Sequence, residues 1–323
     1  MRAIVCKDWG NVEDLTLEDV PPPTANPNEV LIDVKAAAVN FADSLMVAGR
    51  YQTKPDLPFT PGLEASGVIV ACGDGVTNFH PGERVMAMLA HGGYAEQATA
   101  STDDVFVIPD QMDFNDAATF PVSYISSDVA LRWQGRLAAG ETLLVLGAAG
   151  GVGLTAVEIG KAMGARVIAA ASSSEKLAVA RDHGADECIN YAEDSLKEQV
   201  MALTDNRGVN VCFDPVGGDL FDSALSSLAW GGRILVVGFV GGIPQIPANR
   251  LLVKNRSALG CSLRHYRWNE PEKLKQSVAA LFEWYKMGKL SPLVTHTYSL
   301  EDTVDAIELL TSRRAFGKII VNP

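Results

Sequence analysis

The sequence contains few of the residues that build metal centres or disulfide frameworks. It has five cysteines and five histidines in 323 residues, and neither Cys-x-x-Cys nor His-Glu-x-x-His occurs. The cysteines are Cys6, Cys72, Cys188, Cys212 and Cys261. Since metal sites need grouped ligands, we expect none here. An odd, dispersed set of cysteines is typical of reduced thiols, so we predict a cytoplasmic protein.

Three further absences narrow the function. No apolar run is long enough to span a bilayer, and the first residues, MRAIV, do not have the form of a signal peptide. No Gly-x-Ser-x-Gly motif occurs, which argues against a hydrolase of that type. Basic residues are also scarce, because 27 Lys and Arg stand against 39 Asp and Glu, for a net charge of −12. This balance argues against a nucleic acid or an anionic membrane as partner.

What the sequence does have is a strand, a glycine turn and a helix in succession. An apolar run at 142–146 leads into the turn, and apolar residues recur at helical spacing after it. The glycines of the turn are Gly147, Gly150 and Gly153. Such a turn lets the backbone approach a pyrophosphate, which meets the N–H groups of the new helix. The strict Gly-x-Gly-x-x-Gly form is broken by Ala148, so a glycine turn without a nucleotide is the structural alternative.

The texture of the chain changes near residue 123. Residues 1–122 have short apolar runs punctuated by glycine and proline, which suggests a distorted barrel or sandwich. Residues 123–262 alternate strand and helix, which predicts a parallel sheet with helices on both faces. The predicted helices include 123–138, and the predicted strands include 142–146, 166–171, 187–190 and 209–214. The segment 263–323 is too short for a sheet domain of its own, so we expect it to complete the first domain. The predicted fold class is α/β, a doubly wound sheet and a β-rich domain that meet at a cleft.

The end of the strand predicted at 166–171 indicates which dinucleotide is bound. An NAD site normally has Asp or Glu there to bind the ribose hydroxyls. Here alanines are followed by Ser172, Ser173 and, three residues later, Lys176. A carboxylate would repel a 2′-phosphate, whereas hydroxyls, a helix N-terminus and a lysine favour one. We therefore predict NADPH rather than NADH; a serine helix cap with a solvated lysine is the structural alternative.

The absence of metal ligands also limits the acceptor. A nicotinamide enzyme without a metal must polarise its acceptor with hydrogen-bond donors, or use an acceptor that needs little help. Quinones and electron-poor alkenes are such acceptors, and simple alcohols are not.

Six motifs together resemble one family. They are AAVNFAD at 37–43, GRY at 49–51, PGLEASG at 61–67, GAAGGVG at 147–153, DPVGG at 214–218 and GGR at 231–233. Over essentially its whole length the chain resembles the zinc-free quinone oxidoreductases, the zeta-crystallin-like branch of the medium-chain dehydrogenase/reductase superfamily. The resemblance implies a GroES-like catalytic domain, residues 1–122 with 263–323, around a Rossmann NADPH-binding domain, residues 123–262.

The resemblance also bears on zinc. Zinc alcohol dehydrogenases of the same superfamily hold their catalytic zinc with a cysteine three residues before the Asp43 position and a histidine at the Leu63 position. This chain has Asn40 and Leu63 there, and it lacks the four-cysteine lobe of the structural zinc. The resemblance therefore implies a zinc-independent enzyme.

Three catalytic residues are implied by the resemblance. Asn40 matches an asparagine near the nicotinamide and the acceptor, and its amide would bond a quinone or enone oxygen. Asp43 would orient Asn40 or a water, and the Tyr51 hydroxyl would donate to developing negative charge. The structural alternatives are a turn-closing asparagine, a helix-capping aspartate and a packed tyrosine. For Glu64 we favour a structural role.

The coenzyme-binding residues implied by the resemblance fall into three groups. Ala149, Gly150, Gly151 and Val152 lie at the pyrophosphate; Ser172, Ser173, Lys176 and Tyr191 lie on the 2′-phosphate side; Gly238, Phe239, Val240, Cys261 and Ser262 lie towards the nicotinamide. Arg314 and Lys318 are secondary candidates, because helix C-termini attract basic residues anyway. Similar proteins commonly form dimers by pairing the strand near 256–261, so we expect a homodimer.

These observations predict a metal-independent NADPH-dependent oxidoreductase that transfers hydride to a quinone. A reductase of enones or enoyl thioesters shares every binding feature and stays open as an alternative. A non-catalytic NADPH-binding protein and a zinc alcohol dehydrogenase stay open as well. The expected partners are a small quinone or activated alkene and a second copy of the chain, with no nucleic acid or membrane.

Overall fold

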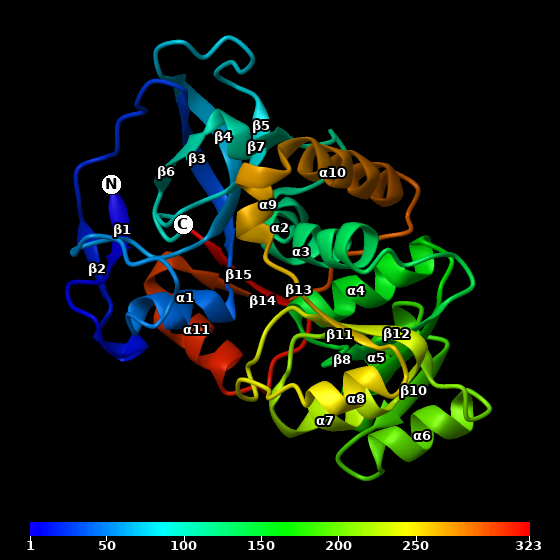
Figure 1. The fold of residues 1–323 in the computed structure, drawn as a ribbon. Helices are drawn as coiled ribbons and strands as arrows, with labels where there is room; N and C mark the ends of the chain where they lie inside the picture. The colour runs from blue at the N-terminus through cyan, green and yellow to red at the C-terminus, as the bar shows by residue number, and fades with distance from the viewer. The chain divides into compact units, whose positions relative to one another are not determined.

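The computed structural model describes all residues from Met1 to Pro323, and they form two compact units (Figure 1). Unit 1 comprises Met1–Val122 and Pro292–Pro323, and unit 2 comprises Ser123–Ser291. Both ends of the chain therefore belong to the same unit. No helix in either unit combines the length and the apolar character needed to cross a membrane.

Unit 1 is built mainly from β-strands. Its main sheet has the order β14-β15-β3-β4-β5-β7, with β6 also paired to β3, and β1 and β2 form a separate antiparallel pair. The strands are β1 (Arg2–Val5), β2 (Thr16–Asp19), β3 (Glu29–Ala38), β4 (Glu64–Cys72), β5 (Arg84–Met88), β6 (Gln97–Ser101), β7 (Val105–Val107), β14 (Val294–Ser299) and β15 (Lys318–Asn322). In β3 the side chains of Val30, Ile32 and Val34 are buried and alternate with more exposed ones, which is the pattern of a strand with one buried face.

Short helices complete unit 1. The α-helices are α1 (Phe41–Val47), α2 (Phe114–Ala118) and α11 (Thr303–Thr311), and the 3-10 turns are η1 (Val12–Asp14), η2 (Thr102–Asp104) and η5 (Leu300–Asp302). α1 contacts α11, and both contribute side chains, such as Met46 and Ile307, to one apolar core. This core fixes the start of α1, where the predicted Asn40 and Asp43 lie.

Unit 2 contains a six-stranded sheet in which every neighbouring pair of strands is parallel. Its order is β10-β9-β8-β11-β12-β13, the 3-2-1-4-5-6 order of dinucleotide-binding sheets. The strands are β8 (Thr142–Leu146), β9 (Arg166–Ala171), β10 (Glu187–Asn190), β11 (Val209–Asp214), β12 (Leu228–Val236) and β13 (Ser257–Gly260). The strands β8, β9 and β11 are almost wholly buried, as expected for a sheet covered on both faces.

Most helices of unit 2 connect these strands in the predicted alternation, and the others precede or follow the sheet in the chain. They are α3 (Ile125–Asp128), α4 (Gly151–Ala162), α5 (Ser174–Asp182), α6 (Leu196–Leu203), α7 (Gly218–Ser226), α8 (Ala248–Leu252), α9 (Leu263–Asn269) and α10 (Pro271–Lys286). The sequence does not predict α8 and α9, because both are short and have no buried residue to give a periodic pattern.

The helix predicted at 123–138 is replaced by a more irregular segment. Two π-helical stretches, η3 (Phe120–Tyr124) and η4 (Val129–Gln134), flank α3. Apolar periodicity predicts helical winding but does not distinguish i→i+5 from i→i+4 hydrogen bonding, which is why the sequence did not reveal these stretches.

The second unit extends further than the predicted boundary at 262/263. α10 packs against α3, and Trp133 Nε1 donates to Ser277 Oγ at 2.9 Å. The pattern of α10 shows which face is buried, with Leu274, Val278 and Leu281, but not which unit covers it. Only 292–323 returns to unit 1. The assignment of a catalytic domain to residues 1–122 with 263–323, and of a coenzyme-binding domain to residues 123–262, stays a prediction.

Candidate functional site

The glycine turn of unit 2 follows β8, a central strand of the sheet. Gly147 has a φ of +58°, a backbone conformation that favours glycine, and the Ala148 N–H donates to Ala170 O at 3.1 Å. A Cβ at Gly153 would lie only 2.1 Å from Gly147 O, so the first turn of α4 can approach the loop only with glycine there. The glycine at 153 therefore sets how closely helix and strand pack.

The N-terminus of α4 has no side chain to cap it. Its N-cap residue is Gly150, and the Leu154 N–H is the first to bond back, to Gly150 O at 2.8 Å. The N–H groups of the helical residues before Leu154 have no carbonyl within the helix to which they can donate. The helix dipole adds partial positive charge at this end. Gly150 is exposed, and Gly151 and Val152 are half-buried, so this end is accessible to an anion such as a pyrophosphate.

The neighbouring strand β9 ends without a carboxylate. Ser172 is exposed, and Ser173 Oγ accepts from the Lys176 N–H at 3.3 Å, so Ser173 caps α5. The Tyr191 N–H donates to Ala171 O at 3.1 Å, which places the start of the loop after β10 beside the end of β9. The predicted 2′-phosphate residues therefore gather at one edge of the sheet.

Loops after the remaining strands reach the same edge. Asp214 Oδ1 accepts from the N–H groups of Val216 and Gly217 at 2.8 and 2.9 Å, and Asp214 O accepts from Gly238 N–H at 3.3 Å. The predicted residues 238–240 begin two positions after the end of β12, and 261–262 follow β13 directly. Since all six strands are parallel, every predicted coenzyme residue lies at or beside their carboxyl ends. Burial raises the pKa of the Cys261 thiol to about 12, so this cysteine is an inert, protonated group.

The predicted catalytic residues lie in unit 1, where Asn40 is the centre of a buried polar network. Its side-chain Nδ2 donates to Glu64 Oε1 at 2.8 Å and to Ala38 O at 3.2 Å. Lys318 Nζ donates to Asn40 Oδ1 at 2.9 Å and to Glu64 Oε1 at 2.9 Å. Both amide hydrogens of Asn40 are therefore bonded within the protein.

The outer bonds of this network tie it to the backbone. Lys318 Nζ also donates to Val39 O at 3.2 Å, and Glu64 Oε2 accepts from the Val122 N–H at 2.7 Å. Every donor on the lysine and both oxygens of the glutamate thus have partners, which is the condition for a stable buried charge pair. The structural role that the sequence favours for Glu64 stays a prediction.

Asp43 lies on the other side of Asn40. Its Oδ2 accepts from the Asn40 N–H at 2.8 Å and from the Tyr94 hydroxyl at 2.6 Å, whereas its Oδ1 is buried without a partner. Burial raises the pKa of Asp43 to about 7, although the bonds from Tyr94 and Asn40 oppose the shift. Asp43 therefore holds the backbone of Asn40, and its carboxyl group exchanges its proton near neutral pH.

Tyr51, the third predicted catalytic residue, lies in the loop after α1. Its N–H donates to Leu45 O at 3.0 Å, and its half-buried ring packs against the unit 1 core. This packing fixes the ring at the edge of the core.

Besides Glu64, two members of the unit 1 network, Tyr94 and Lys318, are not among the predicted catalytic residues. Tyr94 is fully buried, and nothing in its sequence context marks it as polar-bonded. Lys318 is a buried lysine that begins an apolar strand, Lys-Ile-Ile-Val, and this contrast is the signal that could have found it. From the sequence, Lys318 is only a secondary coenzyme candidate near a helix C-terminus. In the structure its ammonium group donates to Asn40 Oδ1.

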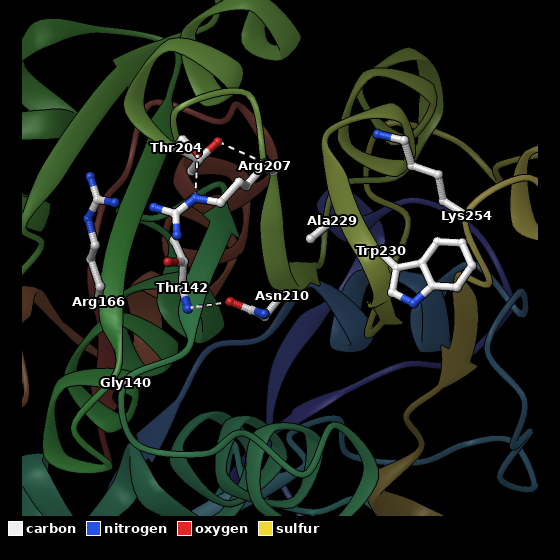
Figure 2. Close-up of a pocket in the computed structure, with 10 residues that line it drawn as sticks. Gly140, Thr142, Arg166, Thr204, Arg207, Asn210, Ala229, Trp230 and Lys254 are labelled. Carbon is white, nitrogen blue, oxygen red and sulfur yellow. Dashed lines mark hydrogen bonds between the residues drawn. The ribbon is translucent and has the colours of Figure 1, made fainter.

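A pocket of about 680 Å³ lies at the opposite, amino edge of the unit 2 sheet (Figure 2). It is lined by residues at strand starts, such as Thr142 and Asn210, and Trp230 and Lys254 lie on the far side. Its arginines are already bonded: Arg166 to Glu187 and Arg207 to Asp205. α6 ends at this edge, and the negative end of a helix does not favour phosphates. The carboxyl edge is therefore the better dinucleotide site.

The residues present do not fit a zinc ion. No group of three or more His, Cys, Asp or Glu side chains is close enough together to bind a metal. At the two positions that hold zinc in related dehydrogenases, Leu63 packs in the apolar core and Asn40 bonds Glu64 and Lys318. The positive charge beside Glu64 is the lysine ammonium.

Comparison with known proteins gives matches over the whole chain. Residues 26–110 match the family model "Alcohol dehydrogenase GroES-like domain", and residues 151–283 match "Zinc-binding dehydrogenase". Quinone oxidoreductase-like protein 2 of Rattus norvegicus is 39% identical over 99% of this chain and 92% of its own length. Quinone oxidoreductase of Homo sapiens is 33% identical over 99% of this chain and 97% of its own length. The structure of Escherichia coli quinone oxidoreductase complexed with NADPH superposes with a TM-score of 0.94 at 29% identity, covering all of both chains.

A GroES-like unit and a six-stranded Rossmann unit with a glycine turn define a medium-chain dehydrogenase or reductase. The identities place the chain more narrowly: it belongs to the zinc-independent quinone oxidoreductase branch of the medium-chain dehydrogenase/reductase superfamily, a family of oxidoreductases. The fold class and the family predicted from the sequence are confirmed.

Proposed function

We propose that the protein is an NADPH-dependent reductase that passes hydride to a quinone without a metal ion. The observation that carries this proposal is the uncapped N-terminus of α4 at the carboxyl end of β8, beside a β9 end that has no carboxylate. The NADPH complex of the Escherichia coli quinone oxidoreductase supports the choice of coenzyme, and the names of the relatives support the choice of acceptor.

The residues of unit 2 are suited to hold such a coenzyme. The N–H groups at the start of α4 would bind the pyrophosphate, because Gly150 leaves room for its oxygens. Ser172 and Lys176 would bind the 2′-phosphate, and Ser173 would orient α5 towards it. Gly238, Phe239, Val240, Cys261 and Ser262 would line the nicotinamide side. When bound, reduced nicotinamide supplies a hydride from its C4.

The residues of unit 1 would serve the acceptor. As a quinone gains hydride, negative charge develops on its oxygen, which a hydrogen-bond donor stabilises. Asn40 has no amide hydrogen left for this task, so the Tyr51 hydroxyl is the proposed donor. Asp43 would act through Asn40, by holding its backbone N–H.

A steady-state comparison of acceptors tests the proposal. We expect NADPH oxidation with 1,4-benzoquinone and 9,10-phenanthrenequinone, and much slower oxidation with 2-enones and enoyl-CoA. Faster turnover of the alkenes would show that the acceptor is an activated alkene and not a quinone. Coenzyme binding without turnover of any acceptor would contradict a reductase and favour a non-catalytic NADPH-binding protein.

We also propose that the protein is a homodimer that pairs β13 with its copy. β13 is the last strand of the sheet and pairs only with β12, so one edge of β13 has no neighbouring strand. Apolar side chains in the loop between β12 and α8 are exposed, among them Ile243 and Ile246. Light scattering should give twice the 34.4 kDa chain mass.

The five free cysteines fit a reducing compartment such as the cytoplasm.

A further inference from the structure

Two buried charges in unit 1 have no part in the function proposed above. Lys318 is 6% exposed and Glu64 is 0% exposed, and Nζ lies 2.9 Å from Oε1. A buried ion pair contributes little net stability, because the loss of hydration offsets the attraction between the charges. The presence of this pair therefore needs a reason other than stability.

The pair fixes the orientation of the Asn40 side-chain amide. Lys318 Nζ donates to Asn40 Oδ1, and Asn40 Nδ2 donates to Glu64 Oε1. An ammonium group only donates hydrogen bonds and a carboxylate only accepts them. A flipped amide would bring donor against donor and acceptor against acceptor. The ion pair thus permits one orientation of the amide.

This orientation leaves a single bonding capacity on the Asn40 side chain. The second Nδ2 hydrogen is bonded to Ala38 O at 3.2 Å, so the nitrogen has no further hydrogen to donate. Oδ1 has two lone pairs, and Lys318 uses one of them. Any further partner of Asn40 must therefore be an N–H or O–H donor that approaches Oδ1.

We propose that Lys318 and Glu64 are positioning residues, which aim the Asn40 carbonyl oxygen at a hydrogen-bond donor of the reacting ligand. The inference rests on the proposed function. The carboxamide of a nicotinamide and the hydroxyl of a reduced quinone are both such donors, whereas an oxidised quinone has only carbonyl oxygens. Asn40 therefore serves as an acceptor, which is the opposite of the role expected from the sequence.

The decisive variant removes both charges, Lys318→Met with Glu64→Gln, so that no unpaired charge stays buried. The glutamine amide can then donate to Asn40 Oδ1, and the enforced orientation is lost. We expect kcat/KM to fall by roughly tenfold to a hundredfold. Asn40→Ala should lose about as much, and the triple variant should lose no more, because the pair acts through Asn40. A fall in NADPH affinity in Asn40→Ala would identify the carboxamide as the donor; a fall in kcat alone would identify the quinol hydroxyl.

A second ion pair provides the structural control. In unit 2, Arg233 bonds both oxygens of Glu141, at 2.8 and 2.7 Å, and touches no predicted site residue. Arg233→Met with Glu141→Gln should lower the melting temperature and leave kcat/KM unchanged. This control separates a loss of stability from a loss of orientation.

Wild-type kcat/KM in the Lys318→Met, Glu64→Gln variant would overturn the inference, as would losses that multiply in the triple variant. A wild-type protein that oxidises no NADPH with any quinone would instead refute the proposed function. In that case the orientation of the Asn40 side-chain amide can still be tested by nuclear magnetic resonance of its NH₂ group. We expect slow hydrogen exchange in the wild type and fast exchange in the double variant; equal rates would contradict the inference.

Discussion

The two units treat their hydrogen-bonding groups in opposite ways. In unit 1, Asn40, Glu64 and Lys318 are buried, and their side chains bond one another and nearby backbone. In unit 2, the N-terminus of α4 has no capping side chain, and its N-cap residue, Gly150, is exposed. A helix end left open binds anions, whereas a closed network holds one group in one orientation. The contrast suggests that unit 2 supplies binding and unit 1 supplies orientation.

The largest effect is expected where the open turn of unit 2 depends on glycine. In Gly153→Ala, the new Cβ would lie 2.1 Å from Gly147 O, so the turn must move. We expect a destabilisation of about 3 kcal/mol and loss of NADPH binding. Thermal unfolding and a fluorescence titration measure both.

Gly150→Ala is the matched control for this turn. The nearest atom to its new Cβ is Gly147 O at 3.4 Å, an ordinary contact. The variant should melt like the wild type. If Gly153→Ala also melts and binds NADPH like the wild type, the close approach of α4 to the turn is wrong.

The next largest effect concerns the closed network of unit 1 and is a dependence on pH. Burial raises the pKa of Asp43 to about 7, above the 3.8 of the free side chain. Between these two pH values the folded protein keeps a proton on Asp43 that the unfolded protein releases. The contribution of Asp43 to stability is therefore fully present below pH 3.8 and is lost as the pH rises through about 7. Asp43→Asn lacks this dependence. Relative to the wild type, its unfolding free energy should rise by on the order of 2–4 kcal/mol between about pH 4 and about pH 8.

Denaturant unfolding of the two proteins at a series of pH values gives this difference directly. Because other carboxylates titrate in the same range, the wild-type curve alone is not diagnostic. A constant difference between Asp43→Asn and the wild type would show that Asp43 is ionised throughout.

A smaller effect should separate the two coenzymes. Lys176→Ala removes a positive charge beside the predicted 2′-phosphate, so NADPH affinity should fall roughly tenfold while NADH affinity stays the same. Titration of both coenzymes by nucleotide fluorescence measures the preference. An unchanged ratio of the two dissociation constants would remove Lys176 from the site.

The smallest effect distinguishes a helix cap from a phosphate ligand. Ser173 Oγ accepts from the Lys176 N–H, so Ser173→Ala should cost about 1 kcal/mol of stability. Ser172 is exposed and caps nothing, so Ser172→Ala should leave stability unchanged and weaken NADPH only. The reverse pattern would exchange the roles of the two serines.

The sequence predicted unit 2 better than unit 1. The strands 142–146, 166–171, 187–190 and 209–214 were predicted with the bounds that the structure has, because buried parallel strands are short apolar runs between turn residues. The same pattern could not predict where α10 docks, since amphipathicity shows a buried face and not its partner. It also missed the π-helical stretches η3 and η4, which share their periodicity with ordinary helix.

The candidate site was predictable in part for a related reason. The predicted coenzyme residues follow strands whose carboxyl ends lie at one edge of the sheet, so the strand order brings these residues together. The network around Asn40 joins residues as far apart in the chain as Asn40 and Lys318, which are 278 positions apart. The contrast between Lys318 and the apolar residues that follow it could have marked this lysine, but no local pattern encodes its partners, which are visible only in the folded structure.

The most direct test of the account is a calorimetric titration of the wild type and Gly150→Val with NADPH and NADH. Valine at 150 would place its methyl groups in front of the α4 N-terminus, where the pyrophosphate is expected. The wild type should bind NADPH more tightly than NADH, and Gly150→Val should bind neither coenzyme while it stays folded. Absence of heat from both coenzymes in the wild type, or undiminished NADPH binding in Gly150→Val, would contradict it.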